Sequence, residues 1–296
     1  MKTSAIVRIV LYSLLFLILL SILLGGLLAD ELLSSLSFDT VIATGDLERV
    51  GAVTASDIRE VNIEWVAGSI TVQTGDTDEI TFSENSDLND SDKMVWTQSG
   101  NKLSIQFSKE KLFFGFNFGF HSNYSKDLVI TIPDDWQAWE LNIDSVSATI
   151  DISDLNTEKL YITNVSGSCT LTDCTATDVE VDTVSGQVDY SGSLLTLNLN
   201  SVSADCTLKL KAGARDINMG CVSGDLTLYL PEEQGFTAKI DGISGDITTD
   251  FATTTTGGTH RFGDGSCSIE GECVSGDIII RKSNRTHNIS QPDWAG

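Results

Sequence analysis

Apolar residues recur along most of the chain in one template, with polar residues between them. Around Val222 the apolar positions are Ile217 and Met219 before it, and Leu226 and Leu228 after it. Each flank alternates with period two, which predicts a half-buried strand. Ser-Gly follows the centre, where the alternation slips by one, and glycine tolerates the backbone angles of a corner. The template therefore predicts two short strands joined by a corner.

The template repeats at a regular interval. Its centres, all predicted to face the core, are Val66, Val146, Val165, Val184, Val202, Val222, Ile243 and Val274. From Val146 to Ile243, consecutive centres are 18 to 21 residues apart. A period near twenty predicts an all-β parallel solenoid, in which rungs stacked about 4.8 Å apart bury continuous apolar columns. The spacing of 31 residues between Ile243 and Val274 indicates an insertion at residues 251–265.

The repeated Val-Ser-Gly-Asp corners resemble those of a known family, the bacterial "putative adhesin" family of β-strand-repeat proteins. The resemblance also includes the first rung at Val61–Val72, the phenylalanine-rich segment Phe113–Phe120 and the closing rung at Cys273–Ile278. It covers about Asp57–Lys282. It implies a parallel solenoid behind a membrane anchor at the cell envelope, with a largely unassigned function and no catalytic residues to transfer.

The N-terminal residues predict a membrane anchor. Ile9–Ala29 is apolar and about as long as a helix that crosses a bilayer. Lys2 and Arg8 precede it, so the positive-inside rule places the N-terminus in the cytoplasm and the residues after Asp30 outside. A cleaved signal peptide is the alternative, but Leu27-Leu28-Ala29 is a poor cleavage site.

These patterns divide the chain into segments. In order, they are a cytoplasmic stub and transmembrane signal anchor (1–29), a stalk (30–56), a first rung with an antiparallel capping meander (57–135), the solenoid repeats (136–282) and a flexible tail (283–296). A cap is expected because the end of a solenoid is an open sheet edge.

Charge narrows the range of partners. The chain has 42 acidic and 18 basic residues, a net charge of -24. This argues against nucleic acid and against direct docking on anionic lipid headgroups, and suits a hydrated extracytoplasmic domain. Outward columns are rich in acids, for example Asp205, Asp225, Asp246 and Asp277. They could form calcium sites, but a solvated acidic face explains them without a metal, and no metal or cofactor is predicted.

The cysteines are interpreted mainly as core residues. Cys169 and Cys206 share an inward column two rungs apart, about 9–10 Å, which exceeds disulfide reach. They are therefore expected to be small buried hydrophobes. Cys221 and Cys273 are likewise predicted to lie two rungs apart, and Cys267 could pair locally with Cys273. Free thiols in such a domain would indicate a reducing habitat.

Two features interrupt the repeat and are candidate interaction surfaces. The phenylalanine-rich segment is either an exposed aromatic patch or, the favoured interpretation, a roof over the first rungs. The insertion at 251–265 carries threonine, glycine and a His-Arg pair suited to polar contacts. It offers no candidate nucleophile in register with His260, so no catalytic residue is predicted. The candidate side chains are Phe114, Phe116, Phe118, Phe120, His260 and Arg261.

The sequence therefore predicts a single-pass membrane protein that carries an acidic extracytoplasmic solenoid. Its expected role is that of a non-enzymatic interaction module of the cell envelope, either an adhesin-like protein or an accessory protein of the envelope-stress response. Its expected partners are the membrane, through one helix, and an envelope glycan, peptide or protein. The alternatives are a calcium-binding surface solenoid and a carbohydrate-acting β-helix enzyme. The enzyme would need clustered acids with Lys or Arg in one groove.

Overall fold

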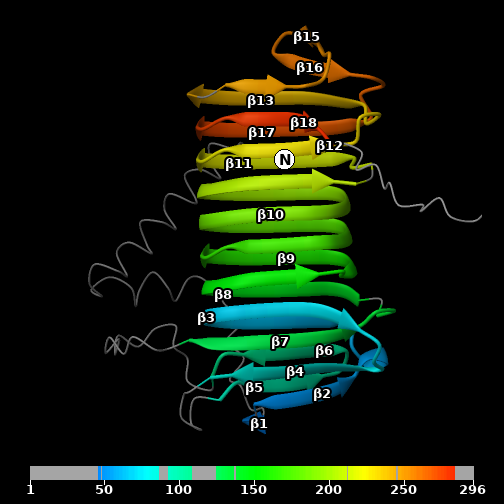
Figure 1. The fold of residues 1–296 in the computed structure, drawn as a ribbon, viewed down its shortest axis with the longest axis vertical. Coiled ribbons are helices and arrows are strands. Elements are labelled where there is room, and N and C mark those ends of the chain that lie inside the picture. The colour runs from blue at the N-terminus through cyan, green and yellow to red at the C-terminus, as the bar shows by residue number, and fades with distance from the viewer. Residues whose placement is uncertain are drawn as a thin grey trace, which may run out of the picture.

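The computed structural model shows a long stack of β-strands (Figure 1). The residues that it describes are 46–47, 49–86, 93–108, 125–136, 138–211, 213–244 and 246–283. The predicted membrane helix at 9–29 and the phenylalanine-rich segment at 113–120 lie outside them. The all-β solenoid that the repeat predicts is confirmed for the described residues.

The middle of the stack follows the order of the chain. Its strands, in stacking order, are β3 (Glu60–Gly75), β8 (Ala138–Ser153), β9 (Asn156–Ser166), β10 (Cys169–Leu210), β11 (Asp216–Ser223) and β12 (Leu226–Leu230). Neighbouring strands pair in parallel and in register, for example Ile143 with Ile162. Each side chain therefore lies above the equivalent one in the next rung, and the apolar columns become continuous.

The flanking apolar columns lie where the alternation predicts. In the rung of β8, Leu141, Ile143, Ile150 and Ile152 are each at most 1% exposed. Their polar neighbours along the strand face outward. Burial of these columns is the main favourable term for the fold, because each rung covers apolar surface that a single rung would leave in water.

The prediction that the template centres face the core is wrong. Val222 and its equivalents, such as Val165 and Val202, are half-buried, and the residue before each of them points inward instead. In the inner rungs that preceding residue is polar: Ser145, Asn164, Thr183 and Ser201 are all at most 7% exposed. The period-two alternation thus continues for one more inward position than expected before the chain turns.

Several of the corners require glycine, although Ala148 and Ala204 occupy the equivalent position in two rungs. Gly224 has φ 118°, a conformation that side chains disfavour. A Cβ there would lie 2.3 Å from the carbonyl oxygen of Ala204 in the neighbouring rung. Gly276 repeats this geometry one rung further along, 2.1 Å from the carbonyl oxygen of Gly224. The repeated Ser-Gly therefore reflects close backbone stacking at the corner.

At the N-terminal end, a later part of the chain supplies the outermost parallel rung. β6 (Lys102–Gln106) and β7 (Lys126–Pro133) both run parallel to β3. Antiparallel strands then cover this rung, β4 (Glu79–Asn85) on β7 and β5 (Val95–Ser99) on β6. The predicted antiparallel cap is thus present, but β6 and β7 belong to a rung.

The segment expected to be a stalk, residues 30–56, contributes to this end. β2 (Val50–Thr54) pairs antiparallel with β4, and β1 (Asp46–Leu47) pairs antiparallel with β5. A short 3-10 turn, Ala55–Asp57, connects β2 to β3. The folded unit therefore begins by residue 46, earlier than the polar composition of this stretch suggests.

At the C-terminal end, the order of the rungs departs from the order of the chain. β17 (Cys267–Ser275) and β18 (Ile278–Lys282) lie between the rung of β11 and β12 and the rung of β13 (Phe236–Ser244) and β14 (Ile247–Thr249). The final rung is therefore inserted beneath the preceding one, as Figure 1 shows. We call this the exchanged rung.

The exchange overturns the predicted arrangement of the C-terminal cysteines. Cys221 pairs with Cys273 in the register of β11 and β17, so the two lie in adjacent rungs and form a disulfide. Cys267 does not pair with Cys273 and is a free, buried thiol. Cys169 and Cys206 are free and buried, as expected.

Candidate functional site

The insertion at 251–265 forms an ordered hairpin. It comprises β15 (Thr254–Thr256) and β16 (Thr259–Phe262), and β16 pairs antiparallel with the outermost strand β13. His260 Nδ1 lies 3.2 Å from the hydroxyl of Thr255, and the guanidinium of Arg261 donates to the backbone carbonyl of Asp264. The hairpin therefore lies at the end of the stack, paired with its outermost strand.

An aromatic cluster fastens this hairpin to the solenoid. The Phe262 ring centroid is 5.9 Å from that of Phe236 and 4.8 Å from that of Phe251. Phe236 is fully buried and Phe251 is 4% exposed. These rings cover the last apolar column, so the hairpin that carries His260 and Arg261 acts as the C-terminal cap.

Hydrogen bonds to the Asp264 side chain hold the turn that follows β16. Bonds from Ser266 to this carboxylate lower the pKa of Asp264, with a smaller contribution from the charge of Arg261. The carboxylate accepts from the backbone N–H of Ser266 at 3.0 Å. Asp264 therefore works as a turn residue that stays ionised, which does not suit a general acid.

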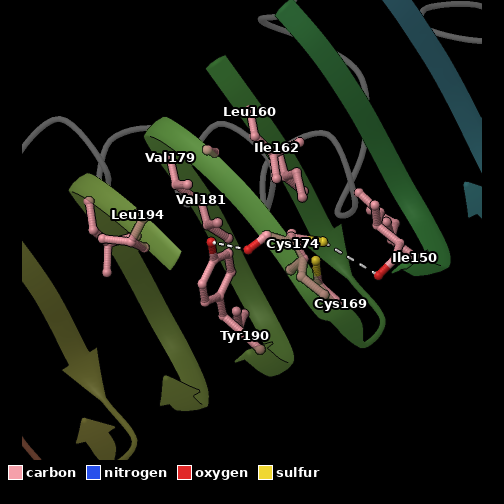
Figure 2. Close-up of a cluster of buried hydrophobic side chains, with 14 of the residues drawn as sticks. Ile150, Leu160, Ile162, Cys169, Cys174, Val179, Val181, Tyr190 and Leu194 are labelled. Atoms are coloured by element: carbon pink, nitrogen blue, oxygen red, sulfur yellow. Dashed lines mark hydrogen bonds between the residues drawn. The ribbon is translucent and has the colours of Figure 1, made fainter. Parts of the chain in front are cut away.

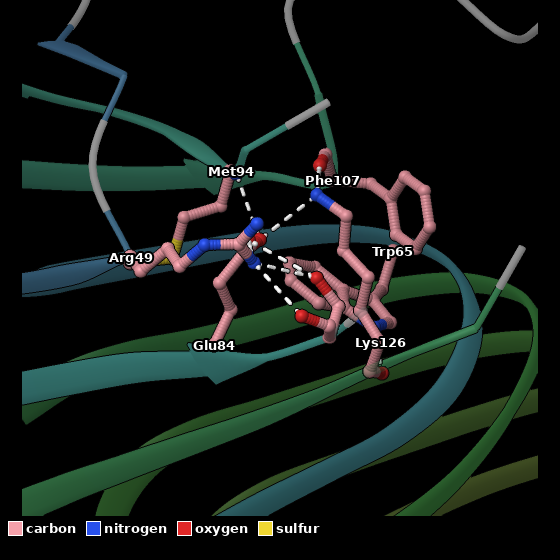
Figure 3. Close-up of polar contacts among 7 residues, drawn as sticks. Arg49, Trp65, Glu84, Met94, Phe107 and Lys126 are labelled. Carbon is pink, nitrogen blue, oxygen red and sulfur yellow. Dashed lines mark hydrogen bonds and ion pairs between the residues drawn. The ribbon is translucent and has the colours of Figure 1, made fainter. Parts of the chain in front are cut away.

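A buried charged cluster at the N-terminal end was not predicted. The Glu84 carboxylate lies 2.8 Å from Lys126 Nζ and 2.8 Å from Arg49 Nη1, and it accepts from the backbone N–H of Met94 at 2.8 Å (Figure 3). The side chains of Glu84 and Lys126 are fully buried. Lys126 Nζ also donates to the carbonyl of Phe107 and lies 4.5 Å from the centroid of its ring.

The strand phase could have revealed this pair. Ile80 and Phe82 face the core, and the same alternation places Glu84 inward. Lys126 and Leu128 are two residues apart in β7, so both side chains point to the buried face of the strand. A pair so well hydrogen-bonded, with one carboxylate between two cations, fixes the packing of the first rung against its cap. It does not reproduce the cluster of acids that a carbohydrate-acting enzyme needs.

The acidic column after the corner forms a hydrogen-bonded ladder. The Asp205 carboxylate accepts from the backbone N–H of Asp225 at 3.0 Å, and that of Asp225 accepts from the N–H of Asp277 at 2.9 Å. Asp277 in turn accepts from the N–H of Asp246 at 2.8 Å. These carboxylates accept hydrogen bonds from backbone N–H groups of the next rung. The acidic column therefore has a structural explanation without calcium.

Neither a metal cluster nor a spanning helix is found in the described part of the chain. Within it, no three His, Cys, Asp or Glu side chains group closely enough to hold a metal ion. The helices of the same residues include none that is long and apolar enough to span a bilayer.

The free thiols are poor nucleophiles. Burial raises the pKa of Cys174 to about 11 and that of Cys206 to about 12, and it also raises the pKa of Cys169. Figure 2 shows Cys169 and Cys174 among aliphatic side chains, and the hydroxyl of Tyr190 donates to the carbonyl of Cys174 at 3.2 Å. At neutral pH these thiols stay protonated, which suits a packing role.

A shallow depression of about 260 Å³ lies on one side of the stack, at the corner opposite the Val-Ser-Gly turns. Its lining includes the hydroxyl residues Thr157, Thr177 and Ser193 and the apolar Leu194, but no charged side chain. The exposed Trp139 belongs to the rung next to Thr157 and stacks with Arg59, whose guanidinium carbon is 5.3 Å from the centroid of its ring. The depression lacks the groups that hydrolysis would require.

Comparison with known proteins points to one family. A family model described as Toastrack DUF4097 matches residues 58–196, from just before β3 into β10. No curated protein matches the chain.

Three solved bacterial structures are similar to the chain, and each aligns with 79% of it. A putative adhesin from Bacteroides fragilis NCTC 9343 has 14% identity, 96% of that chain covered and a TM-score of 0.48. A putative cell adhesion protein from Clostridium sporogenes ATCC 15579 has 14% identity, 98% covered and a TM-score of 0.39. A putative adhesin from Parabacteroides merdae ATCC 43184 has 9% identity, 95% covered and a TM-score of 0.39. The resemblance to the putative adhesin family that the sequence indicated is confirmed by the Toastrack match over residues 58–196.

Proposed function

We propose that this protein is a non-enzymatic interaction module of the cell envelope, anchored by residues 9–29 with its solenoid outside the cytoplasm. The observation that carries the proposal is a regular stack with a cap at each end. Caps suppress edge-to-edge growth where they cover the outermost strands, so the side faces are the larger surface available to a partner. Regular rungs hold the side chains of those faces in fixed rows.

Two further observations support the proposal. The Cys221–Cys273 disulfide fits an oxidising compartment outside the cytoplasm, because thiols stay reduced inside most cells. This inference of an oxidising compartment replaces the inference of a reducing habitat, which assumed free thiols. The buried thiols and the uncharged depression lack the activated groups of an enzyme site.

The experiment uses the full chain with a tag after Gly296, produced in bacterial cells. An external protease should remove the tag from spheroplasts without lysis, and the purified protein should bind isolated envelope material saturably. A tag protected until lysis would overturn the location. A protein that is accessible but shows no saturable binding would overturn the interaction role.

A further inference from the structure

We propose that an outward row formed by Lys209, Tyr229 and Arg281 binds an acidic glycan, a chain of sugar rings that carry carboxylates. This assignment rests on the proposed function and specifies the ligand of one face. The three residues occupy equivalent positions in successive rungs: Lys209 pairs with Tyr229, and Tyr229 pairs with Arg281. We call them the cationic row.

The row faces outward from rigid strands. The residue before each member points into the core: Leu208, Leu228 and Ile280 are at most 2% exposed. Lys209 and Arg281 are exposed, and Tyr229 is half-buried. Rungs are about 4.8 Å apart, so the two cations lie roughly 10 Å apart with the aromatic ring between them.

The charge of the row contrasts with that of the rest of the chain. The chain has a net charge of -24, and several described lysines are paired with a carboxylate, as Lys239 is with Asp241 and Lys282 with Glu232. Within the described ranges, neither Lys209 nor Arg281 forms an ion pair. The adjacent outward column reads Thr207, Thr227 and Ile279, with no acid. The row is therefore a local concentration of positive charge on an acidic protein, bordered in its own column by Asp250 of the outermost rung.

The geometry favours a glycan over other anions. β12 is paired on one side with β10 and on the other with β18, so this face offers no free backbone groups to which an extended peptide could add as a strand. Anionic membrane surfaces are typically bound by clusters of about four to eight Lys or Arg residues, whereas the row provides two. A tyrosine ring provides an apolar surface on which a sugar ring can stack, and Lys and Arg on either side can bind carboxylates of flanking sugars.

The exchanged rung creates the row. Thr249 pairs with Ile280, so Asp250 is the residue of the outermost rung that is equivalent to Arg281. If the rungs followed chain order, Asp250 would lie beside Tyr229 and place a negative charge there. The Cys221–Cys273 disulfide holds the exchanged rung against β11, which fixes Arg281 next to Tyr229.

The test measures binding of the purified full chain to an oligogalacturonate by calorimetry at low ionic strength, with EDTA to exclude calcium bridging. The row variants are Lys209→Gln, Tyr229→Ala and Arg281→Gln. Each should weaken the Kd roughly five- to tenfold, as expected for loss of one charge-assisted or stacking contact. The matched control Lys239→Gln removes an exposed lysine from β13, on the other flank of the rungs, and should leave the Kd unchanged. The fully methyl-esterified oligosaccharide should not bind.

The outcomes separate this assignment from the proposed function. Failure of the wild-type chain to bind the oligosaccharide, equal weakening by Lys239→Gln, or equally tight binding of poly-aspartate would overturn the glycan row. Envelope binding that survives in the Lys209→Gln/Arg281→Gln variant would also overturn it, while leaving the envelope role intact. Loss of envelope binding in that variant, with an unchanged melting temperature, would support it.

Discussion

The two ends of the stack expose the same kind of open strand edge and close it with different chemistry. At the N-terminal end, β4 and β5 cover both halves of the rung of β6 and β7, and a buried Glu84–Lys126 pair joins cap to rung. At the C-terminal end, the β15–β16 hairpin covers β13, while among the described strands β14 pairs only with β18. There a disulfide secures the exchanged rung.

The difference shows where each end draws its stability. The N-terminal cap depends on the geometry of one buried ion pair, which is costly to disturb because an unpaired charge would be left in the core. The C-terminal end depends on a covalent bond one rung further in and on a cluster of aromatic rings packed edge to face or tilted. We therefore expect the N-terminal end to be sensitive to single substitutions and the C-terminal end to be sensitive to redox conditions.

The largest loss of stability is expected in the middle of the stack, which serves as the reference for the two ends. Leu228→Asp places an unpaired charge in the core, which costs several kcal/mol and should unfold a typical domain. Val222→Asp, at the half-buried corner, should cost about 1 kcal/mol or less. Thermal unfolding of the two variants measures the difference. A similar loss for both would mean that the template centres face the core after all.

The second-largest loss of stability is expected at the N-terminal end. Lys126→Met leaves the Glu84 carboxylate buried with one of its cations removed, which should destabilise the protein by about 3–5 kcal/mol. The matched control is Lys102→Met, which breaks a partly exposed pair with Glu60 and should cost about 0–1 kcal/mol. Urea titrations of both variants provide the comparison. Equal midpoints would show that the buried pair does not hold the cap.

The C-terminal end should respond to loss of its disulfide. Cys221→Ser with Cys273→Ser opens a bridge between residues 52 positions apart and should cost about 2–4 kcal/mol. Reductant should lower the stability of the wild-type chain by a similar amount and leave the double variant unaffected. Alkylation of the unreduced, denatured protein should label four cysteines. Labelling of all six would contradict the disulfide.

The smallest effect concerns the aspartate ladder near the exchanged rung. Asp277→Ala removes the acceptor for the backbone N–H of Asp246 and should cost about 0.5–1 kcal/mol. Asp246 ends the ladder, so Asp246→Ala removes no acceptor from a described backbone N–H and should be nearly neutral. Careful denaturant titrations can resolve this difference. Destabilisation by Asp246→Ala alone would argue for a bound cation or another partner at that end.

The inward columns show how far local pattern reaches and where it stops. Positions such as Ile143 and Ile150 were predicted because strict alternation places them on the buried face. The centres were misplaced because Asn164 and Thr183 are polar and yet lie inside. Asn164 Nδ2 donates to the carbonyls of Ala148 and Gly167, each at 3.3 Å, and Thr183 Oγ1 donates to the carbonyl of Ser185. These side chains donate hydrogen bonds to backbone carbonyls at the corner. A pattern of hydrophobic residues alone does not reveal that requirement.

The candidate sites divide in the same way. His260 and Arg261 were identified from their position in an interruption of the repeat, and the structure gives that interruption a capping role. Glu84 and Lys126 were missed because charged residues are expected at the surface, although their phase in β4 and β7 pointed inward. Only the partner strand showed that the two would neutralise each other.

The sequence by itself determined the repeat: the rung length, the two flanking strands, the glycine corner and the acidic outward columns. Those features depend on alternation and backbone sterics within about twenty residues. Only the tertiary structure decided the order of the rungs. Any two rungs with the same columns can stack, so local pattern cannot say that β17 and β18 lie beneath β13 and β14. That choice places Cys273 beside Cys221 and Arg281 beside Tyr229, because side chains far apart in the chain meet only through strand register.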